Sequence, residues 1–392
     1  MTDSKIALPV LKDERTWKKL TINLKRNKQN DKTEDLITAG EKFDYSENKN
    51  QYWNPAEFSF LWGTPLWEQS TEDQRLKLNH IYWLAYYSQI ISAEIATIYL
   101  NQCAAAGMYA VNDFKLVCDN LDVESAQERA HVECFQKVIS NTEEYLFGER
   151  VFGRPMSPYY LETMIYQNTS RIKSFYKRLQ LQAFSLLSSS SAFIGSQYFT
   201  VRGIRTLCGK MVQHILSDFY AKSADQDSIP LPAQISYFHF IDESHHFNSS
   251  RIIAQDVVKS LKEPTAFEKM ITNQLVYACQ KDHFYFSAAI NGIFWYDPAL
   301  YKTVYKVLRS PVFSMGEQEA LEMIRKCFTV ENDALHSSYA THRKAAQSYR
   351  SFVTDMPYIS AKNIEMNFMM SNSVENQLKI NKRCLNKFRR TL

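Results

Sequence analysis

Several glutamate and histidine residues occur at spacings that could hold metal ions. Glu128 and His131 are three residues apart, and Glu243 and His246 repeat that spacing, with His239 four residues before Glu243. On an α-helix, residues three, four or seven positions apart share one face, so each set presents its side chains together. Carboxylate and imidazole ligands suit iron or manganese, and two Glu-x-x-His pairs are typical of two-metal sites in helical bundles.

Glu94 adds a further carboxylate from a third segment. Between Leu78 and Asn112 it is the only Asp, Glu, Lys or Arg residue, and apolar residues surround it in QIISAEIATIYL. A buried carboxylate needs a partner, because an isolated buried charge is very costly. A metal ion is one partner, and an arginine or a hydrogen-bond network is the other. With the two histidine-containing sets, Glu94 completes a candidate metal-binding and catalytic set.

We do not expect the other polar residues near these sets to bind metal directly. Glu124 lies one turn before Glu128, and we expect it to support a ligand or lie on the surface. Asp242 and His245 point away from the ligand face and could orient ligands on neighbouring helices. We expect the remaining histidines of interest to be structural: His214, His283 and His336.

The elements that must position these residues are long helices. Gly (10) and Pro (11) are scarce in 392 residues, which argues against a turn-rich β protein. The pattern predicts core helices over residues 71–106, 112–140, 181–200 and 233–261, a further helix over 206–222, and capping boxes at Thr71-x-x-Gln74 and Ser314-x-x-Glu317. The four serines at 188–191 are expected inside the third core helix.

The predicted fold class is therefore all-α, a ferritin-like four-helix bundle with additional N- and C-terminal helices. We expect residues 1–50 to form a polar, loosely attached N-terminal arm. Residues 51–262 would form the ferritin-like dimetal core, and residues 263–392 would supply C-terminal helices packing on the bundle, with a basic tail.

Charge and cysteine content restrict the class of protein further. The net charge of +4 is no nucleic-acid signature, although basic residues gather in Lys18–Lys32 and Lys379–Arg390, either as solvated termini or as a docking surface for an acidic partner. Seven cysteines without regular spacing suit reduced thiols. With no signal-peptide pattern and no sufficiently long apolar run, we expect a cytoplasmic protein without a membrane span.

The ligand pattern resembles that of a known family. The order Glu94, then Glu128 with His131, then His239 with Glu243 and His246, is similar to the AurF-type (p-aminobenzoate N-oxygenase) dimetal-carboxylate family. Within it, the segments WNPAEFSFLWGTPLWEQ, ESAQERAH and FTVRGIRTL look most like cyanobacterial CylC-like dimetal halogenases. The resemblance covers about Trp53 to Val258 and implies two transition-metal ions, iron or manganese, held by those six residues.

The third core helix departs from the N-oxygenase pattern. That family supplies a glutamate there, whereas this sequence has Gly195, Ser196 and Gln197 at the expected place. We take Gly195 as the vacancy and as a halide site. A chloride could restore both the ligand and the negative charge, and the carbon radical left by hydrogen abstraction could take the halogen in place of hydroxide. Alternatively, Gln197 or water fills the gap, or the third helix aligns differently.

The resemblance then implies an O2-dependent dimetal halogenase that chlorinates an unactivated aliphatic carbon of a fatty acyl substrate in natural-product biosynthesis. Chloride, O2 and external electrons would be cosubstrates, and an acyl carrier protein and an electron donor would be partners. The oligomeric state stays open, with a homodimer as one option. The alternatives are a dimetal oxygenase of the same scaffold, acting as an N-oxygenase or C-hydroxylase, and a non-catalytic helical scaffold or iron-binding protein.

Overall fold

The computed structural model describes residues 13–109, 114–152, 171–286 and 298–392. Over these residues the chain is all α-helical, without a strand, which confirms the predicted fold class. The first twelve residues of the expected arm and the first two of the predicted 112–140 helix lie outside the described residues.

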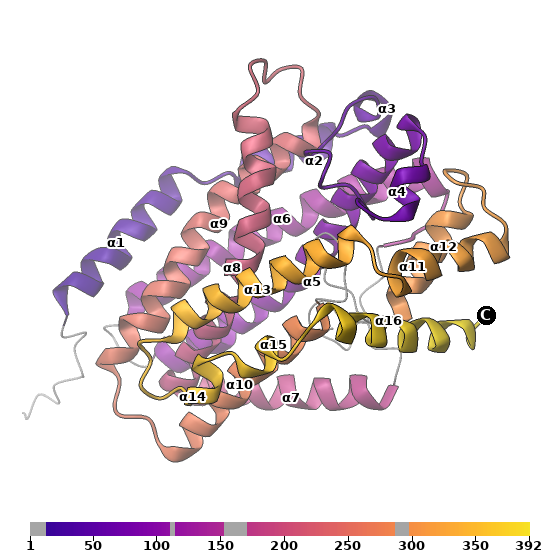
Figure 1. Cartoon of the computed structure of the whole chain (residues 1–392). Coiled ribbons are helices and arrows are strands. Elements are labelled where there is room, and N and C mark those ends of the chain that lie inside the picture. Colours follow the sequence, from indigo (N-terminus) through magenta and orange to yellow (C-terminus); the bar gives the residue numbers. More distant parts are fainter. Residues whose placement is uncertain (1–12, 110–113, 153–170, 287–297) are drawn as a thin grey trace, which may run out of the picture.

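Four long helices form the central bundle: α5 (Glu72–Tyr109), α6 (Lys115–Phe147), α8 (Ala192–Ala221) and α9 (Leu231–Gln255). α5 and α6 run antiparallel, because Asn101 contacts Ser125 (Nδ2 to Oγ, 3.3 Å) while Glu94 contacts His131. α8 and α9 lie side by side in the view of Figure 1. This arrangement is compatible with the expected ferritin-like bundle.

One predicted helix start is confirmed and another is wrong. Before α5, Thr71 N donates to Gln74 Oε1 at 3.0 Å and Gln74 N donates to Thr71 Oγ1 at 3.3 Å, as a capping box requires. α12 (Glu317–Thr329) instead begins after Gly316, whose N–H donates to Glu319 Oε2. Ser314 has a left-handed backbone (φ 51°), which removes it from the predicted capping position.

The third core helix is divided differently from the prediction. α7 (Arg171–Ser190) ends inside the serine run, and α8 begins at Ala192 and continues to Ala221 without a break near residue 203. The side chain of Ser191 accepts a hydrogen bond from Ile194 N at 3.3 Å. Serine favours helix starts because its hydroxyl competes for backbone groups, so the helix boundary falls at Ser191.

Residues 13–48 are not a loosely attached arm, and that expectation is wrong. They form α1 (Glu14–Gln29), α2 (Thr33–Lys42) and the short α3 (Tyr45–Asn48), which contact α6 and α9. Leu20 and Leu36 are fully buried. Asn23 is also buried and donates to Ser249 Oγ at 2.8 Å. Because the inner face of α1 is largely polar and hydrogen-bonded, the hydrophobic periodicity that predicts packing is weak there.

The remaining helices surround the bundle (Figure 1). They are α4 (Pro65–Gln69), the 3₁₀ turn Val257–Ser260, α10 (Ala266–Phe286), α11 (Pro298–Arg309), α12, α13 (Asp333–Val353), α14 (Ala361–Ile364), α15 (Asn367–Met370) and α16 (Val374–Arg389). The expected C-terminal helices are therefore present among the described residues. No described helix combines the length and apolar character needed to cross a membrane.

Candidate metal centre

Glu94 lies at the centre of the bundle and faces histidines from two other helices. It sits on α5 and is 5% exposed. Its Oε1 lies 3.0 Å from His239 Nε2 on α9 and 3.3 Å from His131 Nδ1 on α6. A residue isolated in an apolar stretch of sequence thus meets the two histidine-containing segments in space.

The two Glu-x-x-His pairs lie against one another across the α6–α9 interface. His246 Nδ1 is 2.8 Å from Glu243 Oε1 in its own helix and 3.3 Å from Glu128 Oε1 on α6. His131 Nδ1 is 3.4 Å from Glu128 Oε2. Both spacings predicted from the sequence therefore place their side chains on one helical face.

These residues make two overlapping groups that could hold a metal ion. Glu94, His131, His239 and Glu243 form one group, and Glu128, Glu243 and His246 form the other. Within each group, one donor atom per residue lies within 4.8 Å of the others. Glu243 belongs to both groups.

Several donor atoms of the cluster lack a hydrogen bond of good geometry within the described part of the chain, and a bound cation would supply a partner. Among the described residues, Glu94 Oε2, Glu128 Oε2 and His131 Nδ1 are buried, and no hydrogen bond of standard geometry satisfies them; the contacts of His131 Nδ1 with the carboxylates are 3.3 and 3.4 Å long. Buried polar atoms are rarely left in that state. Three lone-pair donors converging in a buried space fit a metal ion, whose bonds would satisfy all of them.

Burial and mutual charge shift the titration of the cluster strongly. Burial raises the pKa of Glu94 well above its usual value. Burial, together with the charge of His131, lowers the pKa of His239 to about 3. For His246, burial opposes protonation, but the carboxylates of Glu243 and Glu128 prevail and raise the pKa to about 10. Such divergent shifts mark functional sites more often than structural ones.

The outward nitrogens of two histidines are held by hydrogen bonds. His131 Nε2 lies 3.1 Å from Asp242 Oδ2, and Asp242 Oδ1 accepts from the backbone N–H of Lys32 at 3.2 Å. His246 Nε2 lies 2.9 Å from Gln127 Oε1. The expectation that Asp242 orients a ligand on a neighbouring helix matches this geometry.

The N-terminal segment completes this support. Gln127 Nε2 donates to Asn27 Oδ1 at 2.9 Å and to Asp31 Oδ1 at 3.3 Å. Sequence reasoning missed Gln127, Asn27 and Asp31. The polar residues on one face of α1 could have indicated this contact. Without a known partner, however, such a face is interpreted as exposed to solvent.

Asp242→Asn should weaken metal binding by roughly 10- to 100-fold, the usual effect of removing a carboxylate behind a histidine ligand. The reason is that His131 loses the acceptor that fixes its ring and its proton. Metal affinity measured by competition with a chelator checks this. Asp256→Asn is the matched control on the end of the same helix, because Asp256 pairs with Lys19 away from the cluster. Equal affinities for wild type and Asp242→Asn would contradict the assignment.

Glu124 is buried and forms an ion pair with an arginine that the sequence analysis did not single out. Arg202 Nη1 donates to Glu124 Oε2 at 2.6 Å and to Asn101 Oδ1 at 3.3 Å. Glu124 is fully buried and Arg202 is 7% exposed. The surface position considered for Glu124 therefore does not occur, and its carboxylate contacts Arg202 instead of a metal-ligand candidate.

Gly195 lies away from the cluster. A side chain there would meet the carbonyl oxygen of Ser188 at 3.1 Å and that of Ala104 at 3.5 Å, so backbone from α7 and α5 fills the space. Ala104 follows Glu94 by ten residues, which is roughly 15 Å along α5. The structure therefore does not bring Gly195 together with the other candidate site residues.

The other singled-out polar residues also lie outside the cluster. His245 Nε2 faces Asn30 Nδ2 at 3.3 Å instead of a metal-ligand candidate. His214 and His336 are exposed beside Asp218 and Glu331. Asp218 is the sole acidic residue of α8, and it also pairs with exposed Lys222, so α8 contributes no carboxylate to the cluster.

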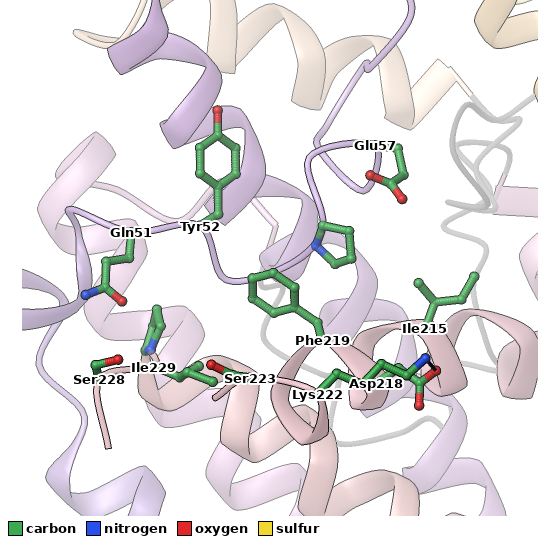
Figure 2. Close-up of a pocket in the computed structure, with 12 residues that line it drawn as sticks. Gln51, Tyr52, Glu57, Ile215, Asp218, Phe219, Lys222, Ser223, Ser228 and Ile229 are labelled. Carbon is green, nitrogen blue, oxygen red and sulfur yellow. Dashed lines mark hydrogen bonds and ion pairs between the residues drawn. The ribbon is translucent and has the colours of Figure 1, made fainter. Parts of the chain in front are cut away.

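A surface pocket of about 990 Å³ lies apart from the metal-ligand candidates. Figure 2 shows Gln51, Tyr52 and Glu57 on one side and side chains from the end of α8 on the other, including Phe219 and Lys222. Its lining includes none of the cluster residues, so the pocket and the cluster are separate features of the fold.

Comparison with known proteins finds a family match over most of the chain. The family model described as "Acyl halogenase CylC-like" matches residues 15–389, which is nearly the whole chain. No curated protein and no solved structure matches the sequence.

Proposed function

We propose, from the premise that the chain belongs to the CylC-like acyl halogenase family, that it is a dimetal-carboxylate enzyme chlorinating an aliphatic carbon of a fatty acyl chain. The family supports an enzyme that halogenates acyl substrates. The observation that carries the dimetal part is the pair of buried donor groups sharing Glu243.

The six residues proposed from the sequence would hold the metals: Glu94, Glu128, His131, His239, Glu243 and His246. Because Glu243 belongs to both groups, its carboxylate would be available to each of two ions. Iron and manganese are the ions that best fit mixed carboxylate and imidazole donors. Such ions, when bound, would supply the redox chemistry by which O2 and external electrons activate a carbon–hydrogen bond.

The protein's own part is to hold the donors and to exclude water. Asp242 and Gln127 fix the outward nitrogens of His131 and His246, so the inward nitrogens keep their direction. His131, His239 and His246 are fully buried. A buried site protects a reactive carbon centre from water until chloride replaces the abstracted hydrogen.

An acyl carrier protein is the proposed carrier of the substrate. Carrier proteins present acidic surfaces, and two helices of this chain expose basic side chains. Lys18, Lys25 and Lys28 are exposed on α1, and Lys382 and Lys387 are exposed on α16. Complementary charge speeds such encounters and makes them dependent on salt.

The experiment is turnover of iron- or manganese-loaded protein with a fatty acyl carrier protein, O2, a reductant and either chloride or bromide. Mass spectrometry should find the halogen in the acyl chain, with the isotope pattern of the halide supplied. A hydroxylated chain in the presence of halide would favour the oxygenase alternative. Absence of any product with metal bound would contradict the enzyme proposal.

A further inference from the structure

Gly209 lies on the face of α8 that points into the bundle. Arg202, seven residues earlier, reaches inward to Glu124 on α6 and Asn101 on α5. Residues seven positions apart on a helix share a face, so a side chain at 209 would point into the same interior.

Gly209 is also level with the metal-ligand candidates. α5 runs antiparallel to α6, and it runs antiparallel to α8 as well, since it meets Arg202 through Asn101 and Gly209 through Tyr86. α6 and α8 therefore run in the same direction. From the Arg202–Glu124 pair, seven residues along α8 reach Gly209 and seven along α6 reach His131, about 10 Å in each case.

Contacts with the neighbouring helix α9 place Gly209 at the same height along the bundle axis. Lys210 Nζ lies 4.5 Å from the ring centroid of Phe247, the residue that follows His246. Gly209 is adjacent to Lys210, so it stands opposite the part of α9 that carries the second donor group. Three helices thus place Gly209 at the axial level of the cluster, where the structure does not place Gly195.

Within the part of the chain that the structure describes, little occupies the space beside Gly209, and polar side chains lie next to it. An added Cβ would meet one heavy atom within 4 Å, Tyr86 Oη at 3.9 Å, whereas Gly107 and Gly203 are closed by backbone or by a phenylalanine ring. Tyr86 is 2% exposed and Gln213, one turn after Gly209, is 4% exposed. The side chains of Tyr86 and Gln213 face one another closely enough to interact. Among the described residues, no hydrogen bond of standard geometry satisfies Tyr86 Oη or Gln213 Oε1.

We infer that this space is a binding site for one halide ion, held by the hydroxyl of Tyr86 and the side-chain amide of Gln213. The inference rests on the proposed function, which requires a halide. Both groups can donate hydrogen bonds to an anion, because a side-chain amide can present its NH₂. Three carboxylates leave two divalent cations with one unbalanced positive charge, which a halide neutralises and water does not.

The first test is an iron-loaded crystal soaked in bromide, with anomalous data at the bromine edge. The expected result is a bromine peak between Gly209 and Tyr86. Gly209→Glu and its neutral match Gly209→Gln both fill the space and should remove the peak. A peak elsewhere, or one that survives in both variants, overturns the site. If the space-filling variants do not fold, the wild-type crystal alone decides the location.

The second test changes the two side chains that we propose to bind the halide but not the metals. Tyr86→Phe and Gln213→Leu should each raise the chloride concentration for half-maximal turnover on the order of tenfold, because each removes one hydrogen bond to the anion. Metal content should not change. Unaltered chloride dependence in both variants overturns the assignment.

The site and the proposed function fail in different ways. Chlorinated product without a bromine peak beside Gly209 overturns the site and leaves the halogenase intact. A bromine peak beside Gly209 without halogenated product supports the site and contradicts the halogenase.

Discussion

Glu243→Ala should lose both metal ions and reduce halogenation by more than about 100-fold, since even an indirect partner of a ligand contributes 10- to 100-fold. The physical reason is its membership of both donor groups: its removal leaves each group one carboxylate short. Metal content by elemental analysis and product by mass spectrometry measure the two effects. Full metal content in the variant would contradict the shared-ligand assignment.

Two comparisons sharpen this experiment. His246→Ala removes a donor from one group only, so we expect it to keep more metal than Glu243→Ala. Glu263→Ala changes an exposed glutamate beyond the end of α9 and should keep wild-type metal content. Identical loss in His246→Ala and Glu243→Ala would show that the two groups do not act as separate positions. Circular dichroism confirms that each variant is folded.

Arg202→Met should lower the free energy of unfolding by about 3–5 kcal/mol, the usual effect of removing one partner of a buried ion pair. The variant leaves the carboxylate of Glu124 buried without its cation. Methionine has similar bulk, so lost packing contributes little. Urea denaturation of the metal-free protein measures the change.

The double variant Arg202→Met with Glu124→Gln separates charge from packing. It removes the orphaned charge, and it should therefore recover much of the lost stability. The pair between Lys222 and Asp218 has the same distance, 2.6 Å, but the side chains are 75% and 35% exposed. Lys222→Met should therefore change stability by less than about 1 kcal/mol. Equal effects of Arg202→Met and Lys222→Met would contradict the buried-pair argument.

The sequence by itself determined the features that depend on spacing within one helix. Helical periodicity places Glu128 with His131, and Glu243 with His239 and His246, on single faces whatever the rest of the chain does. The scarcity of glycine and proline likewise determined the all-α class. Each of these inferences needs only local geometry, which is why it could be made before any contact was known.

Contacts between helices were decided by the tertiary structure. Asp242 behind His131, Arg202 beside Glu124 and Asn27 behind Gln127 join segments far apart in sequence, and their pairing depends on how whole helices pack. The sequence could say that Glu124 needed a partner if buried, but it could not say which residue would supply one.

The vacancy expected in the third helix illustrates the same difference between local spacing and helix packing. From the sequence, the absence of a ligand carboxylate between His131 and His239 was visible, but its position depended on where that helix begins and how far it slides along its neighbours. Ser191 caps α8, and the Arg202–Glu124 pair aligns α8 with α6. Gly209 therefore lies at the axial level of the cluster, whereas Gly195 packs against the backbone of Ser188 and Ala104. Composition and spacing determine which ligand types a chain possesses. The axial register between two helices depends on packing along their full length, so that register is known only from the folded structure.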